Sequence, residues 1–112
     1  MILNERFVYI HVPKTGGTFI TKMLYKLHPT FKSQSVLDKG LERWAILTGK
    51  TGDLIIDTTR YGTKHGTCQE IPKKFLKKTI FSTIRSPYEY YVSAYEFSWW
   101  KKYPQKFFVQ VD

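Results

Sequence analysis

The residues best suited to chemistry in the N-terminal part of this chain form one run, residues 11–18, with the sequence HVPKTGGT. Its two glycines let the backbone approach a ligand closely, and the amides that open a helix carry the positive end of the helix dipole. Lys14 adds a full positive charge on a long side chain, and Thr15 and Thr18 supply hydroxyl groups. These residue types in this order predict a loop that binds a phosphate or sulfate group.

This loop differs from the phosphate loop of ATPases, G-x-x-x-x-G-K-[ST], because Lys14 precedes the two glycines instead of following them. Residues 49–51 (GKT) have the ATPase order. However, the motif also needs a glycine at position 44, which is Trp44, and no predicted strand leads into it. We therefore reject the ATPase motif at both places.

A second run with chemical potential covers residues 85–95, with the sequence RSPYEYYVSAY. Arg85 ends a predicted strand beside a helix N-terminus, so a guanidinium group and a helix dipole converge where an anion would rest. Ser93 lies four residues after Glu89, which lies three residues after Ser86, so these side chains share one face of the helix. Because that face is separate from the predicted aromatic stripe, Ser93 is available to a ligand.

The elements that must position these runs alternate between strands and helices. Short apolar runs rich in β-branched residues predict strands, and apolar residues at helical spacing predict amphipathic helices. The predicted strands cover residues 6–12, 54–57 and 77–85, and the predicted helices cover residues 18–28, residues 37–48 and a segment that begins at Ser86. This alternation predicts βαβ units on a parallel sheet, with the ligand at the carboxyl ends of the strands.

Each predicted helix has an apolar stripe that we expect to be buried. Ser86 is the predicted N-cap of the third helix, with Pro87 at its first position and Glu89 completing a capping box. The expected stripes are Phe19, Ile20, Met23, Leu24 and Leu27 in the first helix, Leu37, Leu41, Trp44 and Ala45 in the second, and Tyr88, Tyr91, Val92, Tyr95 and Trp99 in the third.

The composition fits one folded domain with an affinity for anions. The chain has 112 residues, of which 42% are hydrophobic and 17% aromatic, and these fractions exclude a disordered tail. Its length predicts a radius of gyration of about 13 Å. Eighteen Lys and Arg against nine Asp and Glu give a net charge of +9, which attracts nucleic acids, nucleotides, sulfated ligands and acidic sugars.

Targeting and redox signals are few. The single cysteine, Cys68, cannot form an internal disulfide, and the apolar run at residues 7–12 is too short for a membrane span or a signal peptide. No His or Cys cluster has the spacing of a metal site. We therefore expect a cytoplasmic protein with no membrane partner and no metal.

The order Pro-Lys-Thr-Gly-Gly-Thr after a strand resembles the 5′-phosphosulfate loop of sulfotransferases that use 3′-phosphoadenosine 5′-phosphosulfate (PAPS), especially in the carbohydrate and heparan-sulfate-type branch. Residues 85–95 resemble the 3′-phosphate site of that family, R-x-P-x-x-R-x-x-S-x-Y, with Tyr90 where the family has its second arginine. The resemblance covers residues 6–97. The resemblance implies a P-loop-like parallel sheet with flanking helices. It also implies that residues 1–112 form a single sulfotransferase-like domain, which is the PAPS-binding portion.

The resemblance also implies a reaction and a role for each site residue. The reaction is in-line transfer of a sulfuryl group from PAPS to a hydroxyl acceptor such as a carbohydrate, which leaves adenosine 3′,5′-bisphosphate. Lys14 is implied to stabilise the leaving oxygen, and His65, in the polar stretch before the third strand, is implied to accept the acceptor proton. The residues implied to bind the donor are Lys14, Thr15, Gly16, Gly17 and Thr18 for the 5′-phosphosulfate, and Arg85 and Ser93 for the 3′-phosphate.

Two further expectations concern the histidines and the length of the chain. His11, in the first predicted strand, is predicted to be a packed, hydrogen-bonded core residue. Related catalytic domains are considerably longer, so we expect a natural miniature, a truncated gene or an N-terminal fragment. Such a chain exposes apolar surface, which predicts self-association or a swapped dimer.

Two other functions remain as alternatives. In a P-loop kinase or NTPase, Asp57 would follow a strand as a Mg²⁺ ligand, although the position of the lysine contradicts that class. A non-catalytic basic module would bind nucleic acid or a sulfated polysaccharide through its lysines and aromatic side chains. The residues of that module are Lys73, Lys74, Lys77 and Lys78 with Trp99, Trp100 and Tyr103. No sequence signature of a specific nucleic-acid-binding fold is present, so no specific nucleic-acid partner is expected.

Overall fold

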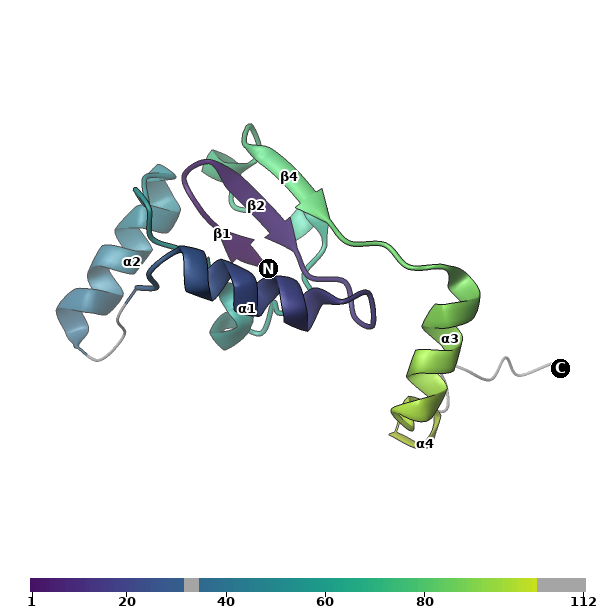
Figure 1. Cartoon of the computed structure of the whole chain (residues 1–112). Helices are drawn as coiled ribbons and strands as arrows, with labels where there is room; N and C mark the ends of the chain where they lie inside the picture. Colours follow the sequence, from purple (N-terminus) through teal and green to yellow (C-terminus); the bar gives the residue numbers. More distant parts are fainter. Residues whose placement is uncertain (32–34, 103–112) are drawn as a thin grey trace, which may run out of the picture.

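The computed structural model describes residues 1–31 and 35–102 (Figure 1). Its strands are β1 (Ile2–Leu3), β2 (Phe7–Ile10), β3 (Ile56–Asp57) and β4 (Thr79–Ser82), and its α-helices are α1 (Gly17–Leu27), α2 (Val36–Thr48), α3 (Pro87–Glu96) and α4 (Trp99–Lys102). Three short 3₁₀ helices lie between β3 and β4: η1 (Thr58–Tyr61), η2 (Cys68–Glu70) and η3 (Lys73–Phe75). The strands form one sheet in the order β3-β1-β2-β4.

The sheet is mixed, which corrects the expectation of a parallel sheet in one respect: the three predicted strands run in one direction, but the additional strand β1 is antiparallel to its neighbours. β2 and β4 are parallel, whereas β1 is antiparallel to both β2 and β3. The reason is the tight turn between β1 and β2, in which the Asn4 amide donates to the Phe7 carbonyl at 2.9 Å. A connection this short joins only antiparallel strands. β2, β3 and β4 still run in one direction, so their carboxyl ends share one edge of the sheet.

The core lies on both faces of this small sheet, because successive strand residues point to opposite faces. On one face Leu3, Val8 and Ile56 are buried against Ala45 of α2 and Phe75 of η3. On the other face Ile2, Tyr9 and Ile55 are buried against Leu24 of α1. The sheet is therefore sandwiched between α1 and the pair formed by α2 and η3.

The predicted apolar stripes are buried only in part. Leu24 of α1 and Ala45 of α2 are buried. Phe19, Met23, Leu27, Leu37, Leu41 and Trp44 are exposed. Strands of two to four residues form a sheet too small to cover helices of 11 and 13 residues, which explains the error. No helix in the described part of the chain is both long enough and apolar enough to cross a membrane.

The third helix departs furthest from the prediction. α3 projects from the sheet edge after β4 (Figure 1), and of its residues only Ala94 is buried. The predicted stripe of Tyr88, Tyr91, Val92 and Tyr95 is exposed, and the Trp99 side chain lies outside the described residues. This arm raises the radius of gyration to 16.4 Å, well above the value expected for a compact chain.

The capping box predicted for α3 was also wrong. Ser86 is the N-cap and Pro87 the first helical residue, as expected, but the Ser86 side chain makes no capping hydrogen bond. Glu89 instead lies 3.9 Å from Arg85 in an ion pair. The positive charge of Arg85 attracts the Glu89 carboxylate, which accounts for the departure of that side chain from the capping position.

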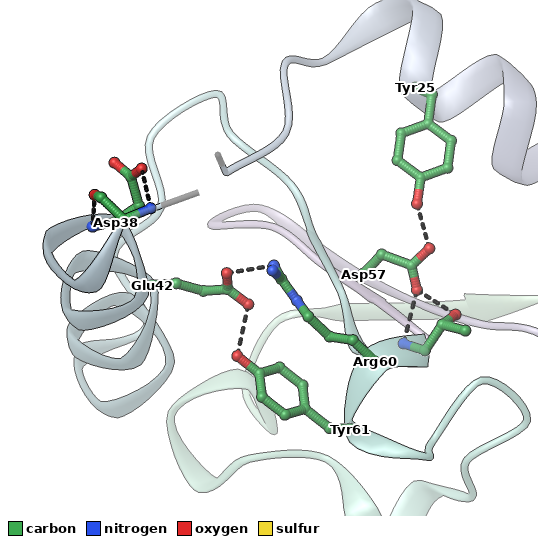
Figure 2. A network of polar contacts seen from close by, with 8 residues as sticks. Tyr25, Asp38, Glu42, Asp57, Arg60 and Tyr61 are labelled. Atoms are coloured by element: carbon green, nitrogen blue, oxygen red, sulfur yellow. Dashed lines mark hydrogen bonds and ion pairs between the residues drawn. The ribbon is translucent and has the colours of Figure 1, made fainter. Parts of the chain in front are cut away.

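A buried carboxylate joins α2 to the segment after β3 (Figure 2). Glu42 is 1% exposed, although it does not belong to the apolar stripe predicted for this helix. Its two oxygens accept hydrogen bonds from the Arg60 guanidinium and, at 2.8 Å, from the Tyr61 hydroxyl. A buried charge needs such partners, so this network holds α2 in place.

Replacing Arg60 tests this network. We expect Arg60→Met to lower the free energy of unfolding by about 2 kcal/mol, because it removes the cation that hydrogen-bonds the buried Glu42 carboxylate. The loss is smaller than for a fully buried pair, since the Arg60 side chain is 38% exposed. Urea unfolding followed by circular dichroism measures the change.

The matched control is Glu89→Gln, which removes the carboxylate of an exposed ion pair and should change the free energy of unfolding by about 0.5 kcal/mol or less. Adding Glu42→Leu to Arg60→Met should restore part of the stability, because an apolar side chain then replaces the buried carboxylate. Equal losses of unfolding free energy in Arg60→Met and Glu89→Gln would contradict the stabilising role assigned to the contact between Arg60 and Glu42.

Candidate functional site

The parallel pairing of β2 and β4 brings the two sequence motifs together. The chain leaves β2 into the loop of residues 11–16 and leaves β4 toward Arg85, both at the carboxyl edge of the sheet. The Arg85 guanidinium donates a hydrogen bond to the Lys14 carbonyl at 3.2 Å. The structure therefore joins the predicted phosphosulfate loop to the predicted 3′-phosphate motif by direct contact.

The backbone of the loop has an unusual shape. The backbone angle φ is 61° at Lys14 and 84° at Gly16. Both values lie in the left-handed region, which residues other than glycine seldom adopt. A lysine held there indicates a constrained loop, as is common at functional sites. Gly16 meets the requirement without strain, since a left-handed conformation costs a glycine little.

The start of α1 offers backbone amides to an anion. The Gly16 carbonyl accepts from the amides of Phe19 and Ile20 at 3.0 and 3.2 Å. The amides of Gly17 and Thr18 precede these and have no helical carbonyl to bond. They lie at the positive end of the helix dipole, which is the geometry that binds phosphate and sulfate groups.

Thr15 ties the loop to the neighbouring strand end. Its hydroxyl donates to the Val12 carbonyl at 2.8 Å, so it accepts from the Thr83 hydroxyl, which lies 2.7 Å away. The proton of Thr15 is therefore used within the protein, and this residue holds the shape of the loop. Its direct contact with a donor stays a prediction, as does that of the exposed Thr18.

Lys14 contacts both ends of the segment that carries α3. Its carbonyl accepts from Arg85, before the helix, and its ammonium group lies 3.1 Å from the ring centroid of Phe97, the residue that caps the helix C-terminus. Partial desolvation lowers the pKa of Lys14 below its ordinary value.

The remaining residues of the predicted 3′-phosphate site lie on α3. Ser93 is half-buried, and no hydrogen bond joins its side chain to residues 11–18 in the described part of the chain. Tyr90, at the place of the family's second arginine, is half-buried and packs edge-on against Tyr91 with 5.7 Å between ring centroids. Arg85 is therefore the residue of this motif that the structure brings to the loop.

The two histidines of the candidate site are in contact. His11 is 8% exposed and directly follows β2, so its prediction as a packed, hydrogen-bonded histidine is confirmed. The partner of its Nδ1 is the Nδ1 of His65, 3.0 Å away. Burial lowers the pKa of His11, and the nearby His65, Lys64 and terminal amine lower it further.

The segment that carries His65 is held by the first residue of the chain. The ammonium group of Met1 donates to the carbonyls of Thr63 and Lys64 at 2.9 and 3.0 Å, and to the Thr58 hydroxyl at 3.0 Å. Because Met1 precedes β1, the sheet itself positions the exposed His65 ring beside the loop. Sequence patterns did not indicate this contact, since it joins residues more than sixty positions apart.

The structure gives Asp57, the Mg²⁺ ligand of the kinase alternative, a different set of partners (Figure 2). Its carboxylate accepts from the Tyr25 hydroxyl and from the amide and hydroxyl of Thr59, the latter two at 2.9 and 2.6 Å. Burial acts to raise the pKa of Asp57, but these hydrogen bonds outweigh it and hold the pKa below its ordinary value. Burial and the Asp57 carboxylate together raise the pKa of Tyr25.

The lysines of the basic-module alternative have mixed environments. Lys73, Lys74 and Lys77 are exposed. Lys78 instead donates to the Gly49 carbonyl, and its ammonium group lies 4.5 Å from the ring centroid of the buried Phe75. Its side chain is therefore engaged in contacts within the fold. The side chains of Trp99 and Trp100, and the whole of Tyr103, lie outside the described residues.

Comparison with known proteins gives one match. A family model described as "Sulfotransferase family" matches residues 3–109, which is most of the chain and includes both motifs. No curated protein and no solved structure matches.

Gly17 offers a test of the contact between the start of α1 and His11. A Cβ atom at Gly17 would lie 2.6 Å from Nε2 of His11, so we expect Gly17→Ala to lower the free energy of unfolding by about 1 to 3 kcal/mol. The control is Gly40→Ala in α2, where a Cβ meets no atom within 4 Å. The Gly40→Ala change should raise the free energy of unfolding by about 0.5 to 1 kcal/mol. A stabilising Gly17→Ala in urea unfolding would refute this packing.

The lowered pKa of His11 predicts a dependence of stability on pH. In the unfolded chain His11 titrates near its ordinary value of 6.5, whereas burial keeps it neutral to lower pH in the folded state. The unfolded state therefore binds more protons below that pH, and stability is lost as pH falls toward the folded pKa.

We expect the urea midpoint to fall between about pH 7 and pH 5 in the wild-type protein, and to fall less in His11→Phe. The surrounding groups, His65, Lys64 and the terminal amine, are retained in both proteins. Identical pH profiles for the two proteins would exclude His11 as the source.

Proposed function

Because the chain belongs to the sulfotransferase family, we propose that it transfers a sulfuryl group from PAPS to the hydroxyl group of an acceptor, with carbohydrates as the acceptor class. The observation that carries the proposal is the contact between Arg85 and the Lys14 carbonyl at 3.2 Å. Two motifs far apart in the sequence meet there, at the edge of the sheet where ligands bind in folds of this kind.

The residues at this edge fit a donor that carries two anionic groups. The loop supplies the amides of Gly17 and Thr18, the dipole of α1 and the charge of Lys14. Arg85 supplies a second cation beside them, with Glu89 as an exposed partner 3.9 Å away. We assign the 5′-phosphosulfate to the loop and the 3′-phosphate to Arg85, with Ser93 as a further ligand on α3.

Each of these groups has a task in the transfer. When bound, PAPS supplies a sulfuryl group on a good leaving group, adenosine 3′,5′-bisphosphate. Lys14 and the loop amides stabilise the negative charge that develops on the bridging oxygen as its bond to sulfur breaks. His65 takes the proton of the acceptor hydroxyl while the oxygen of that hydroxyl forms the new bond to sulfur.

Calorimetric titration with adenosine 3′,5′-bisphosphate tests the donor site without knowledge of the acceptor. We expect binding by the wild-type protein, and affinities about 10- to 100-fold lower for Lys14→Ala and Arg85→Ala, since each variant loses a charge-assisted contact to an anion. The control is Lys73→Ala, which removes an exposed positive charge of η3 and should change the affinity by about twofold or less.

Parallel titrations separate the alternatives. Binding of ATP that requires Mg²⁺ would favour a nucleotide kinase or NTPase. Binding of an oligonucleotide that weakens steeply with salt, together with no response to the bisphosphate, would favour a basic module. Unchanged bisphosphate binding in both Lys14→Ala and Arg85→Ala would overturn the proposed donor site.

A further inference from the structure

The Nδ1 atom of His65 lies within hydrogen-bond distance of two groups of one residue. The backbone carbonyl of His11 is 3.1 Å away, and the ring Nδ1 of His11 is 3.0 Å away. The ring centroids are 4.7 Å apart, so the two imidazoles also touch. Both groups belong to the residue that directly follows β2 and begins the loop.

These two neighbours determine where the proton of His65 resides. A carbonyl oxygen only accepts, so Nδ1 of His65 must be the donor to it. The same N–H is shared with Nδ1 of His11, which therefore accepts and carries no proton. In the neutral pair His65 is protonated on Nδ1 and His11 on Nε2, and the basic lone pair of His65 is on Nε2.

We propose that His11 is a positioning residue for the sulfuryl transfer: its carbonyl and ring nitrogen hold His65 in the Nδ1–H tautomer, so that Nε2 is the base that receives the acceptor proton. This inference rests on the proposed function. Free histidine favours the other tautomer, so the protein must select this one. After the proton transfer, the Nδ1–H of the His65 imidazolium still faces two acceptors, which stabilise its charge.

The surroundings of His11 suit this task. The ring is 8% exposed, and it packs against Gly17, at which a Cβ atom would lie 2.6 Å from its Nε2. Tyr9 contacts it edge-on, with 6.3 Å between ring centroids. Burial and the nearby positive charges lower the pKa of His11, so it stays neutral and remains able to accept.

Nitrogen-15 NMR of the whole chain tests the proposal directly. Near pH 8, about 1.5 units above the ordinary histidine pKa, long-range ¹H–¹⁵N spectra distinguish protonated from unprotonated ring nitrogens. We expect His65 to show a protonated Nδ1 and an unprotonated Nε2, and His11 to show the reverse. A His65 protonated mainly on Nε2 would overturn the proposal, and this measurement needs no variant.

Two substitutions at His11 separate hydrogen bonding from packing. His11→Phe keeps a ring beside Gly17 but removes the ring acceptor, so the Nδ1–H fraction of His65 should fall toward that of free histidine. His11→Asn offers an oxygen near the position of Nδ1 and should restore that fraction. Equal tautomer fractions in wild type, His11→Phe and His11→Asn would show that the His11 ring does not select the tautomer.

An activity readout connects the tautomer to the reaction. With PAPS as the donor and a desulfated glycosaminoglycan as the acceptor, kcat should fall in His11→Phe by the same factor as the Nδ1–H fraction, with KM for PAPS unchanged. The titration with adenosine 3′,5′-bisphosphate distinguishes a failure of the tautomer proposal from a failure of the proposed function. Bisphosphate binding with the wrong tautomer would overturn this inference alone, whereas the expected tautomer without bisphosphate binding would overturn the proposed function.

Discussion

The parallel pairing of β2 with β4 is the constraint on which the rest of the molecule depends. Four residues of each strand are in register, from Phe7 opposite Thr79 to Ile10 opposite Ser82, and the Ser82 hydroxyl adds a bond to the Ile10 carbonyl at 2.7 Å. Buried backbone groups need such partners, so the pairing is strongly favoured once Val8 and Tyr9 enter the core. It places the ends of both strands side by side, which makes Arg85 a neighbour of Lys14.

Much of this arrangement could be predicted from local sequence. Glycines after an apolar run indicate a loop before a helix, Pro87 after Ser86 indicates a helix start, and Gly49 indicates a helix end. The structure confirms all three, with α1 beginning at Gly17, α3 at Pro87 and α2 ending at Thr48 before the left-handed Gly49. These signals depend on a few neighbouring residues. The assignment of two anion-binding motifs to strand ends followed from the same signals.

The features that sequence did not indicate depend on contacts between distant residues. β1 pairs with β2 on one side and with β3 on the other, although no periodicity in the sequence marks a two-residue strand. Glu42 is buried because Arg60 and Tyr61 reach it, and the leucines of α2 are exposed because the sheet ends before it can cover them. Self-association or a swapped dimer through exposed apolar surface stays a prediction.

His11 connects the two halves of the candidate site. Its ring contacts Gly17, the first residue of α1, and its Nδ1 and carbonyl contact His65. A change in the loop that moves Gly17 must therefore move the His11 ring, since a buried ring in contact with backbone has no free space to absorb the shift. The ring would carry that displacement to Nδ1 of His65. Under the proposed function, donor binding at the loop and the orientation of His65 as the base would thus be coupled through one buried side chain, which directly follows β2.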